Sequence, residues 1–238
     1  MDTKIIEWQD VGQHGVVNIH PMEIMAVGHW PEEDDLLMYI GKCAGTAYKP
    51  RSFFDDTDKE ADIKRALNCI RDGHHSVLEH VQLSILTVVD RGVSHALVRH
   101  RHTAFTQSST IYERYSTSID IIAVPKEDPL LPGKNNPSCA PVSDTELDAY
   151  KYSAVEYMSL IREGVPPSRA RDVLHTALAT RLVMSTHIGE WVYVVRRRSG
   201  KGDTVRMHCF AHMLDTLLRK NYPTVMEEFD KYYMRRPL

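Results

Sequence analysis

The hydrophobic period changes between residues 59 and 89, and this change constrains the fold of the 238-residue chain more than any other feature. Apolar residues first recur at the spacing of one helix face, at Ile63, Ala66, Leu67 and Ile70. Residues 81–89 then alternate in polarity and are rich in β-branched side chains, which predicts a strand. A helix and a strand this close along the chain predict a mixed α+β domain.

Polar residues and glycines predict where these two elements end. Residues 57–60 form a capping-box pattern at the start of the helix over 59–72, and Gly73 stands where a C-cap glycine is expected. Gly92 is expected to end the strand, and a short helix over about 93–98 to lead into Arg99.

The second half of the chain is predicted to be mainly helical. Residues 125–143 are rich in proline and predict a surface loop, and residues 144–163 predict a helix. A new helix is expected to begin near Ser168 and to continue through Leu174, Leu178 and Leu182. A last amphipathic helix over about 204–220 has one apolar row at Val205, Cys209, Met213 and Leu217. The chain shows no internal repeat and no shift in composition, which predicts that residues 1–238 form one domain with more helix than strand.

The composition excludes several classes of protein. Lys plus Arg is 29 and Asp plus Glu is 32, and this net charge of −3 argues against a generic nucleic-acid-binding protein. No apolar run has the roughly 20 residues of a membrane-spanning helix, so no membrane partner is predicted. With no visible secretory signal and four widely spaced cysteines without a Cys-x-x-Cys pair, we expect a cytoplasmic protein with reduced thiols.

The densest group of cationic and polar side chains is Arg99-His100-Arg101-His102, followed by hydroxyl-bearing residues at 103–110. Two guanidiniums this close repel each other unless an anion lies between them, and arginine binds phosphate through two hydrogen bonds. This group suits a pyrophosphate-bearing cofactor. A solvated basic turn paired with nearby acids is the alternative.

Two further clusters are less specific. Residues 73–80 hold three histidines and Glu79, but without a His-Glu-x-x-His pattern they favour structural hydrogen bonds, and no metal is predicted. Residues 169–198 hold Arg171, His187, Tyr193 and Arg198, which a long helix would present at one end. The chain has no Gly-x-Gly-x-x-Gly or Walker loop, so the clusters alone indicate only an enzyme or binding protein for phosphorylated ligands.

Taken in order, the three clusters resemble the flavin-dependent thymidylate synthase family. Its Arg-His-Arg, seven residues, Ser signature stands at residues 99–109. Its Gly-His-x-Ser-x-x-Glu-His segment matches residues 73–80, and its Ala-Arg-x-x-Leu-Pro segment, which leads to a Trp and an Arg, resembles residues 170–198. The resemblance covers about residues 40–220.

This resemblance implies an α+β fold with mixed helices and an antiparallel-rich sheet, in a homotetramer whose active sites lie between subunits. It implies FAD as cofactor, with NADPH and methylenetetrahydrofolate as co-substrates, for C5-methylation of a uracil nucleotide. The flavin-binding residues it implies are His75, Glu79, Arg99, His100 and Arg101, with His187 and Tyr193 in the positions of two asparagines. The nucleotide-binding residues it implies are Gln107, Ser109, Arg171 and Arg198. Arg198 and Ser109 are also the catalytic candidates, with Ser109 as a nucleotide contact rather than a nucleophile, since no base is assigned to it.

The departures from the family pattern lie mainly on the nucleotide side. A family glutamine is Ala96 here, the phosphate-binding arginine of Ser-x-Arg is Ile111, and the proline of Leu-Pro is His175. Isoleucine has no donor, so we expect Arg114 to restore the phosphate contact. The pattern favours a divergent member acting on UMP or dUMP, as in a branch of the family that methylates UMP in nucleoside-antibiotic biosynthesis.

Three alternatives stay open. The first is an FAD-binding protein of the same fold without methylase turnover, and the second is an ordinary dUMP-specific thymidylate synthase. The third is an RNA-binding module that uses Arg196-Arg197-Arg198 and Arg219-Lys220, which the balanced charge and the lack of interleaved aromatic residues disfavour.

Overall fold

The computed structural model describes residues 4–10, 13–47 and 58–235, and these form a mixed α+β fold, as predicted. The strands are β1 (Lys4–Asp10), β2 (Gln13–His20), β3 (Glu23–Val27), β4 (Gln82–Asp90), β5 (Ala104–Gln107), β6 (Ser118–Ile122) and β7 (Ala179–His187). The helices are α1 (Glu33–Gly45), α2 (Lys59–Asp72), α3 (Arg91–Leu97), α4 (Asp144–Arg162), α5 (Pro167–Ala170), α6 (Ile188–Arg198), α7 (Val205–Asn221) and α8 (Pro223–Arg235). Short 3₁₀ segments are η1 (His75–His80), η2 (Pro137–Cys139) and η3 (Arg171–Val173).

The strands form two sheets, and antiparallel pairing dominates, as expected. The central sheet has the order β3-β4-β7-β5 and is antiparallel throughout. The smaller sheet has the order β1-β2-β6, with an antiparallel β1-β2 pair and a parallel β2-β6 pair. A hydrogen bond from Ile122 N to Ala177 O, just before β7, connects the two sheets.

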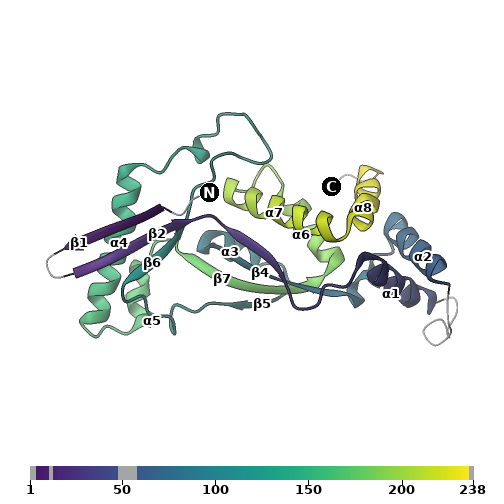
Figure 1. The fold of residues 1–238 in the computed structure, drawn as a ribbon, viewed down its shortest axis with the longest axis horizontal. Helices are drawn as coiled ribbons and strands as arrows, with labels where there is room; N and C mark the ends of the chain where they lie inside the picture. Colours follow the sequence, from purple (N-terminus) through teal and green to yellow (C-terminus); the bar gives the residue numbers. More distant parts are fainter. Residues whose placement is uncertain (1–3, 11–12, 48–57, 236–238) are drawn as a thin grey trace.

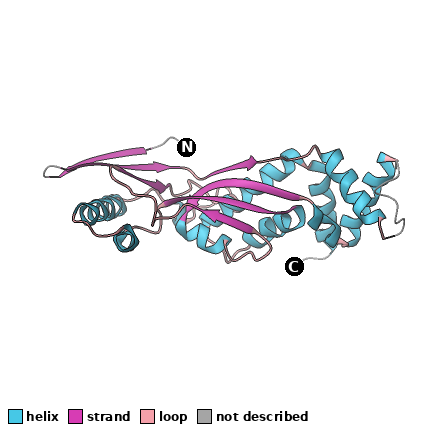
Figure 2. Cartoon of the chain, turned by 90° about the horizontal axis from the view of Figure 1, so that it is seen from below, coloured by secondary structure: helices cyan, strands magenta, loops and turns pink. Residues whose placement is uncertain are grey.

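Each sheet has its own apolar core within an elongated molecule (Figures 1 and 2). The larger core lies between the central sheet and α1, α2, α6, α7 and α8, and its largest fully buried side chains include Trp191, Tyr222 and Phe210. The smaller core lies between β2, β6 and α4, around the fully buried Tyr157. The helices α1, α2 and α8 gather at one end of the molecule and α4 and α5 at the other (Figure 1). No described helix is both long and apolar enough to cross a bilayer.

Several predicted elements are confirmed, and the structure identifies the residues that cap them. The helix α2 spans residues 59–72, the Asp58 carboxylate accepts from Glu60 N at 3.0 Å, and Gly73 has a φ of +86° as its C-cap. Thr57 of the predicted capping box lies outside the described residues. The helix α4 begins with a capping box between Ser143 and Glu146, because the missing bonds at a helix N-terminus are met by side chains. The strand β4 begins one residue later than predicted.

The predicted helix through Leu174, Leu178 and Leu182 is wrong. Pro166, not Ser168, caps the four-residue helix α5, and residues 179–187 form β7, the partner of β4. An interval of four residues fits a helix face, but it is also two strand periods, so it does not discriminate between them. The alternation of buried Thr180, Leu182, Met184 and Thr186 with less buried neighbours shows the strand period.

Two smaller predictions also need correction, and several elements were not predicted. Gly92 does not end the strand but lies in the first turn of α3, where the Asp90 carboxylate caps the helix by accepting from Val93 N at 2.8 Å. The predicted row on α7 lies at the edge of its buried face, which is formed by Phe210, Ala211, Leu214 and Leu218. The sequence interpretation assigned no element to β1, β2, β3, α1, β5, β6 or α8.

Candidate functional site

The Arg-His-Arg sequence lies in the turn between α3 and β5. The buried Leu97 fixes the end of α3, and its carbonyl accepts a hydrogen bond from His100 N at 3.0 Å. This turn directs His100 inward, where it is 6% exposed, and leaves Arg99 and Arg101 at the surface. The turn therefore places one buried imidazole, that of His100, between two exposed guanidiniums.

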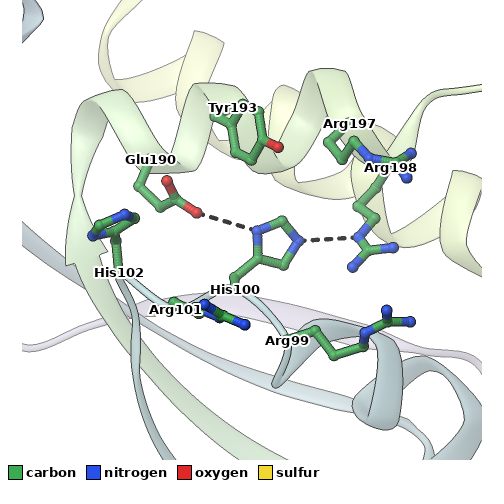
Figure 3. A pocket seen from close by; sticks show the side chains of 8 residues that line it. All are labelled: Arg99, His100, Arg101, His102, Glu190, Tyr193, Arg197 and Arg198. Carbon is green, nitrogen blue, oxygen red and sulfur yellow. Dashed lines mark hydrogen bonds and ion pairs between the residues drawn. The ribbon is translucent and has the colours of Figure 1, made fainter.

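A cavity of about 500 Å³ lies between this turn and α6, and we call it the Arg-His-Arg cavity. It is lined by Arg99, His100, Arg101, His102, Glu190, Tyr193, Arg197 and Arg198. Figure 3 shows the two sides facing each other, with the turn residues on one side and the α6 residues on the other.

His100 is held at both ring nitrogens by residues of α6. Its Nδ1 lies 3.1 Å from Glu190 Oε1, and its Nε2 lies 3.0 Å from Arg198 Nε (Figure 3). Since Arg198 Nε–H can only donate, His100 Nε2 accepts, and Nδ1 carries the proton that it donates to Glu190. The ring is therefore held as one neutral tautomer.

The surroundings of His100 favour the same protonation state. Burial lowers the pKa of His100, and the cationic Arg198 and Arg197 lower it further, while the hydrogen bond to Glu190 acts in the opposite direction. Arg198 is itself fixed, because its Nη2 donates to Ala96 O at 2.6 Å and its Nη1 lies 3.5 Å from Asp203.

The cavity has a surplus of positive charge. Arg99 and Arg101 form no ion pair with the described residues, whereas Arg197 and Arg198 share the carboxylate of Asp203. Unpaired guanidiniums beside a cavity suit a phosphate or pyrophosphate group, which accepts charge-assisted hydrogen bonds. The residues at this site therefore fit the pyrophosphate of a dinucleotide cofactor.

The predicted flavin contacts on α6 lie at or beside the same cavity. His187 caps α6 by accepting from Glu190 N at 3.2 Å through Nδ1, and burial lowers the pKa of His187. Tyr193 lines the cavity with its ring edge-on to His100, at 6.0 Å between centroids. The structure thus brings Arg99, His100 and Arg101 together with Tyr193 at one cavity, whereas His187, at the end of β7, does not line it and contacts its lining residue Glu190.

The two predicted contacts on η1 do not line this cavity. His75 Nε2 lies 3.1 Å from Ile70 O, and its ring lies against Phe229 and Tyr232 of α8. Glu79 is exposed and close enough to His187 for its charge to oppose the lowering of the His187 pKa. Among the described residues, no group of three His, Cys, Asp or Glu side chains is placed to hold a metal ion.

The predicted nucleotide-binding residues on β5 and after it lie outside the Arg-His-Arg cavity. The Gln107 amide donates to Ser94 Oγ and Thr180 Oγ1, each at 3.0 Å. The Ser109 hydroxyl accepts from Ile111 N at 3.3 Å, and both Ile111 and Arg114 are exposed.

Arg171 lines a second cavity, of about 250 Å³, which we call the Arg171 cavity. Its lining also includes Arg91, His95, Thr110 and His175. No role was predicted for Arg91, His95 or Glu190, whereas Thr110 was among the hydroxyl-bearing residues after Arg-His-Arg and Arg197 belonged to the RNA-binding alternative. The dense cationic sequence at 196–198 was the one available signal for Arg197.

Comparison with known proteins identifies the family of the chain. Residues 27–224 match the family described as thymidylate synthase complementing protein. The chain belongs to this family. Its relatives include the flavin-dependent thymidylate synthases of Corynebacterium diphtheriae, 23% identical over 171 residues, and of Geobacter sulfurreducens, 28% identical over 165 residues. Each alignment covers 66% of this chain, and it covers 65% and 64% of those two relatives, so the match spans somewhat under two thirds of their length.

A solved structure has the same fold as this chain. The UMP/dUMP methylase PolB from Streptomyces cacaoi, bound with 5-Br dUMP, has 17% sequence identity to the chain and a TM-score of 0.69. The match covers 90% of this chain and 97% of PolB.

Proposed function

We propose that this chain is a flavin-dependent enzyme that methylates C5 of a uracil nucleotide, UMP or dUMP. The observation that carries the proposal is the Arg-His-Arg cavity, where unpaired Arg99 and Arg101 face the cationic end of α6. Membership of a family whose relatives are flavin-dependent thymidylate synthases supports it. The shared fold with a UMP/dUMP methylase supports the substrate class.

In this proposal FAD supplies the redox chemistry, with NADPH as reductant and methylenetetrahydrofolate as carbon donor. The chain's residues bind and orient. Arg99 and Arg101 bind the flavin phosphates, and neutral His100 keeps Arg198 in place through its Nε2. His75, Glu79, His187 and Tyr193 are the further flavin contacts.

The nucleotide contacts are Gln107, Ser109, Arg171 and Arg198. In one chain, Arg198 lines the Arg-His-Arg cavity, Arg171 lines the Arg171 cavity, and the other two line neither. This separation is consistent with a homotetramer whose sites combine residues from different subunits. Arg114 is the contact that the sequence assigns to the phosphate in place of Ile111.

FAD binding by the Arg101→Ala variant tests the proposal. Loss of one charge-assisted hydrogen bond to a phosphate is expected to weaken binding about ten- to hundred-fold, measured by quenching of flavin fluorescence. Arg162→Ala is the matched control, because Arg162 is an exposed arginine at the end of α4 that lines neither cavity. Equal FAD affinity of the wild type and Arg101→Ala would refute the role of this cavity.

A second candidate is an FAD-binding protein without turnover, which the donor-free residues Ala96 and Ile111 favour. The two functions are distinguished by whether reduced flavin in the purified protein is reoxidised by the substrates. Under anaerobic conditions NADPH should bleach the flavin absorbance of the enzyme, and nucleotide with methylenetetrahydrofolate should restore it and yield a C5-methylated nucleotide. Bleaching without restoration by either UMP or dUMP would favour the binding protein.

A further inference from the structure

The Arg171 cavity brings together cationic and polar groups from three distant parts of the chain. Arg91 and His95 come from α3, Thr110 from the segment after β5, and Arg171 from η3. Asp172 is the one carboxylate in its lining, and it is exposed and forms no ion pair with the described residues. The remaining lining residues are Leu174, His175, Thr176 and Leu178.

The guanidinium of Arg91 is not fully hydrogen-bonded. Its Nη1 is buried without a hydrogen-bond partner in the described part of the chain. Neither Arg91 nor Arg171 forms an ion pair with a described residue. The nearby Asp90 accepts from Val93 N through Oδ1, while its Oδ2 lies 3.7 Å from Arg206 Nε and is likewise buried without a hydrogen bond from a described residue. A buried donor without an acceptor is unfavourable, so this arrangement favours an anionic ligand that supplies the acceptor.

The other polar groups of the cavity suit a phosphate. The Thr110 side chain is 5% exposed and offers a hydroxyl donor. Burial and the cationic Arg206 lower the pKa of His175, so His175 is disfavoured as a cation, and the guanidiniums of Arg91 and Arg171 are the permanent positive charges in the lining. Guanidiniums bind the oxygens of a phosphate through paired hydrogen bonds.

We propose that Arg91, opposite Arg171, binds the phosphate of the nucleotide substrate and replaces the arginine that Ile111 lacks. This inference rests on the proposed function. It assigns the role to Arg91 rather than to Arg114, which is exposed and lines neither cavity. Arg91 begins α3 and Arg99 follows its end, so one helix of about 10 Å connects the nucleotide phosphate site to the flavin site.

The test compares UMP with uridine, which lacks the phosphate, by calorimetry in the absence of turnover. Wild-type protein should bind UMP more tightly than uridine. Arg91→Met should weaken UMP binding about ten- to hundred-fold and leave uridine binding unchanged. Arg169→Met is the matched control, since Arg169 is exposed, two residues from Arg171, and outside the cavity lining.

Arg114→Met distinguishes the two assignments. If it loses the preference for UMP while Arg91→Met keeps it, the proposal for Arg91 is refuted. A wild-type protein that binds neither UMP nor dUMP would instead refute the proposed function. It would also refute the assignment of a nucleotide to this cavity. These two failures are therefore separable in one set of titrations.

The thermal stability of the ligand-free protein gives a second readout. If Arg91 serves only the fold, Arg91→Met should lower the melting temperature. If it serves a ligand, removing an unpartnered buried guanidinium nitrogen should leave the melting temperature equal or higher. Inorganic phosphate should then raise the melting temperature of the wild type and not that of Arg91→Met. A destabilised variant that phosphate still stabilises would overturn the proposal.

Discussion

At the scale of single residues, the state of His100 is set by two contacts that lie far apart in the sequence. Glu190 accepts from Nδ1 and Arg198 donates to Nε2, and both residues belong to α6. Protonating the ring would place a second proton against the Arg198 guanidinium and break that bond. The neutral ring is thus part of what holds Arg198 at the cavity.

This arrangement predicts a loss of stability in mild acid. The pKa of His100 is lower in the folded chain than its usual value of about 6.5, so the unfolded chain takes up the proton first as the pH falls. The free energy of unfolding should fall as the pH drops from about 6.5 toward the lowered pKa, by at most about 1.4 kcal/mol per pH unit from this group, and should not change for this reason above pH 6.5.

Urea unfolding of the ligand-free protein at several pH values between 5 and 8 checks this. His175 and His187 act in the same direction, so the comparison is with His100→Asn, which keeps a donor toward Glu190 and does not titrate. The variant should show a shallower pH dependence than the wild type. Equal slopes would show that His100 does not contribute.

At the scale of elements, the close approach of α1 and α2 depends on one glycine. A Cβ at Gly41 would overlap the backbone carbonyl of Asp62, and backbone atoms cannot move aside as a side chain can. The same site holds a buried network, in which Arg65 donates to Gly41 O at 2.9 Å and pairs with the Asp62 carboxylate. The sequence pattern of α2 does not reveal this contact.

Gly41→Ala is therefore expected to lower the free energy of unfolding by about 2–3 kcal/mol, although alanine is the better helix former. Urea unfolding followed by circular dichroism measures it. Gly202→Ala is the control, since a Cβ there meets no atom within 4 Å, and it should change stability by less than about 0.5 kcal/mol. A fully stable Gly41→Ala protein would contradict the close packing of α1 on α2.

At the scale of the whole molecule, the proposed flavin and nucleotide residues lie in different cavities of one chain. Arg171 lines one cavity and Arg198 the other, while Ser109 lines neither. An assembly in which subunits complete each other's sites would bring these groups to one ligand. The two cavities favour an oligomer with shared sites, and the family resemblance is the reason to expect four subunits.

Complementation between two variants tests that assembly. Arg171→Ala and Ser109→Ala proteins should each be inactive alone. After mixing under conditions of subunit exchange, methylation activity should recover, because some sites would regain both residues. Exchange is verified by mass spectrometry of the mixed oligomers. Verified exchange without recovered activity would indicate that each site is built from one chain.

Features that depend on near neighbours along the chain could be predicted from the amino-acid sequence. The helix α2 with its C-cap Gly73, the helix α4 and the strand β4 could be predicted from periods and end signals within about twenty residues. The Arg-His-Arg sequence likewise pointed to an anion site, because its charges are adjacent.

The tertiary structure alone decided the features that depend on distant partners. Leucines four residues apart fit a helix and a strand equally, and pairing with β4 made residues 179–187 a strand. The contact of His100 with Glu190 spans 90 positions, and the cavity shared by Arg91 and Arg171 spans 80. Such contacts arise from packing between elements, which a local sequence pattern does not indicate. They set the protonation state of His100 and leave the Arg91 guanidinium without an ion-pair partner among the described residues.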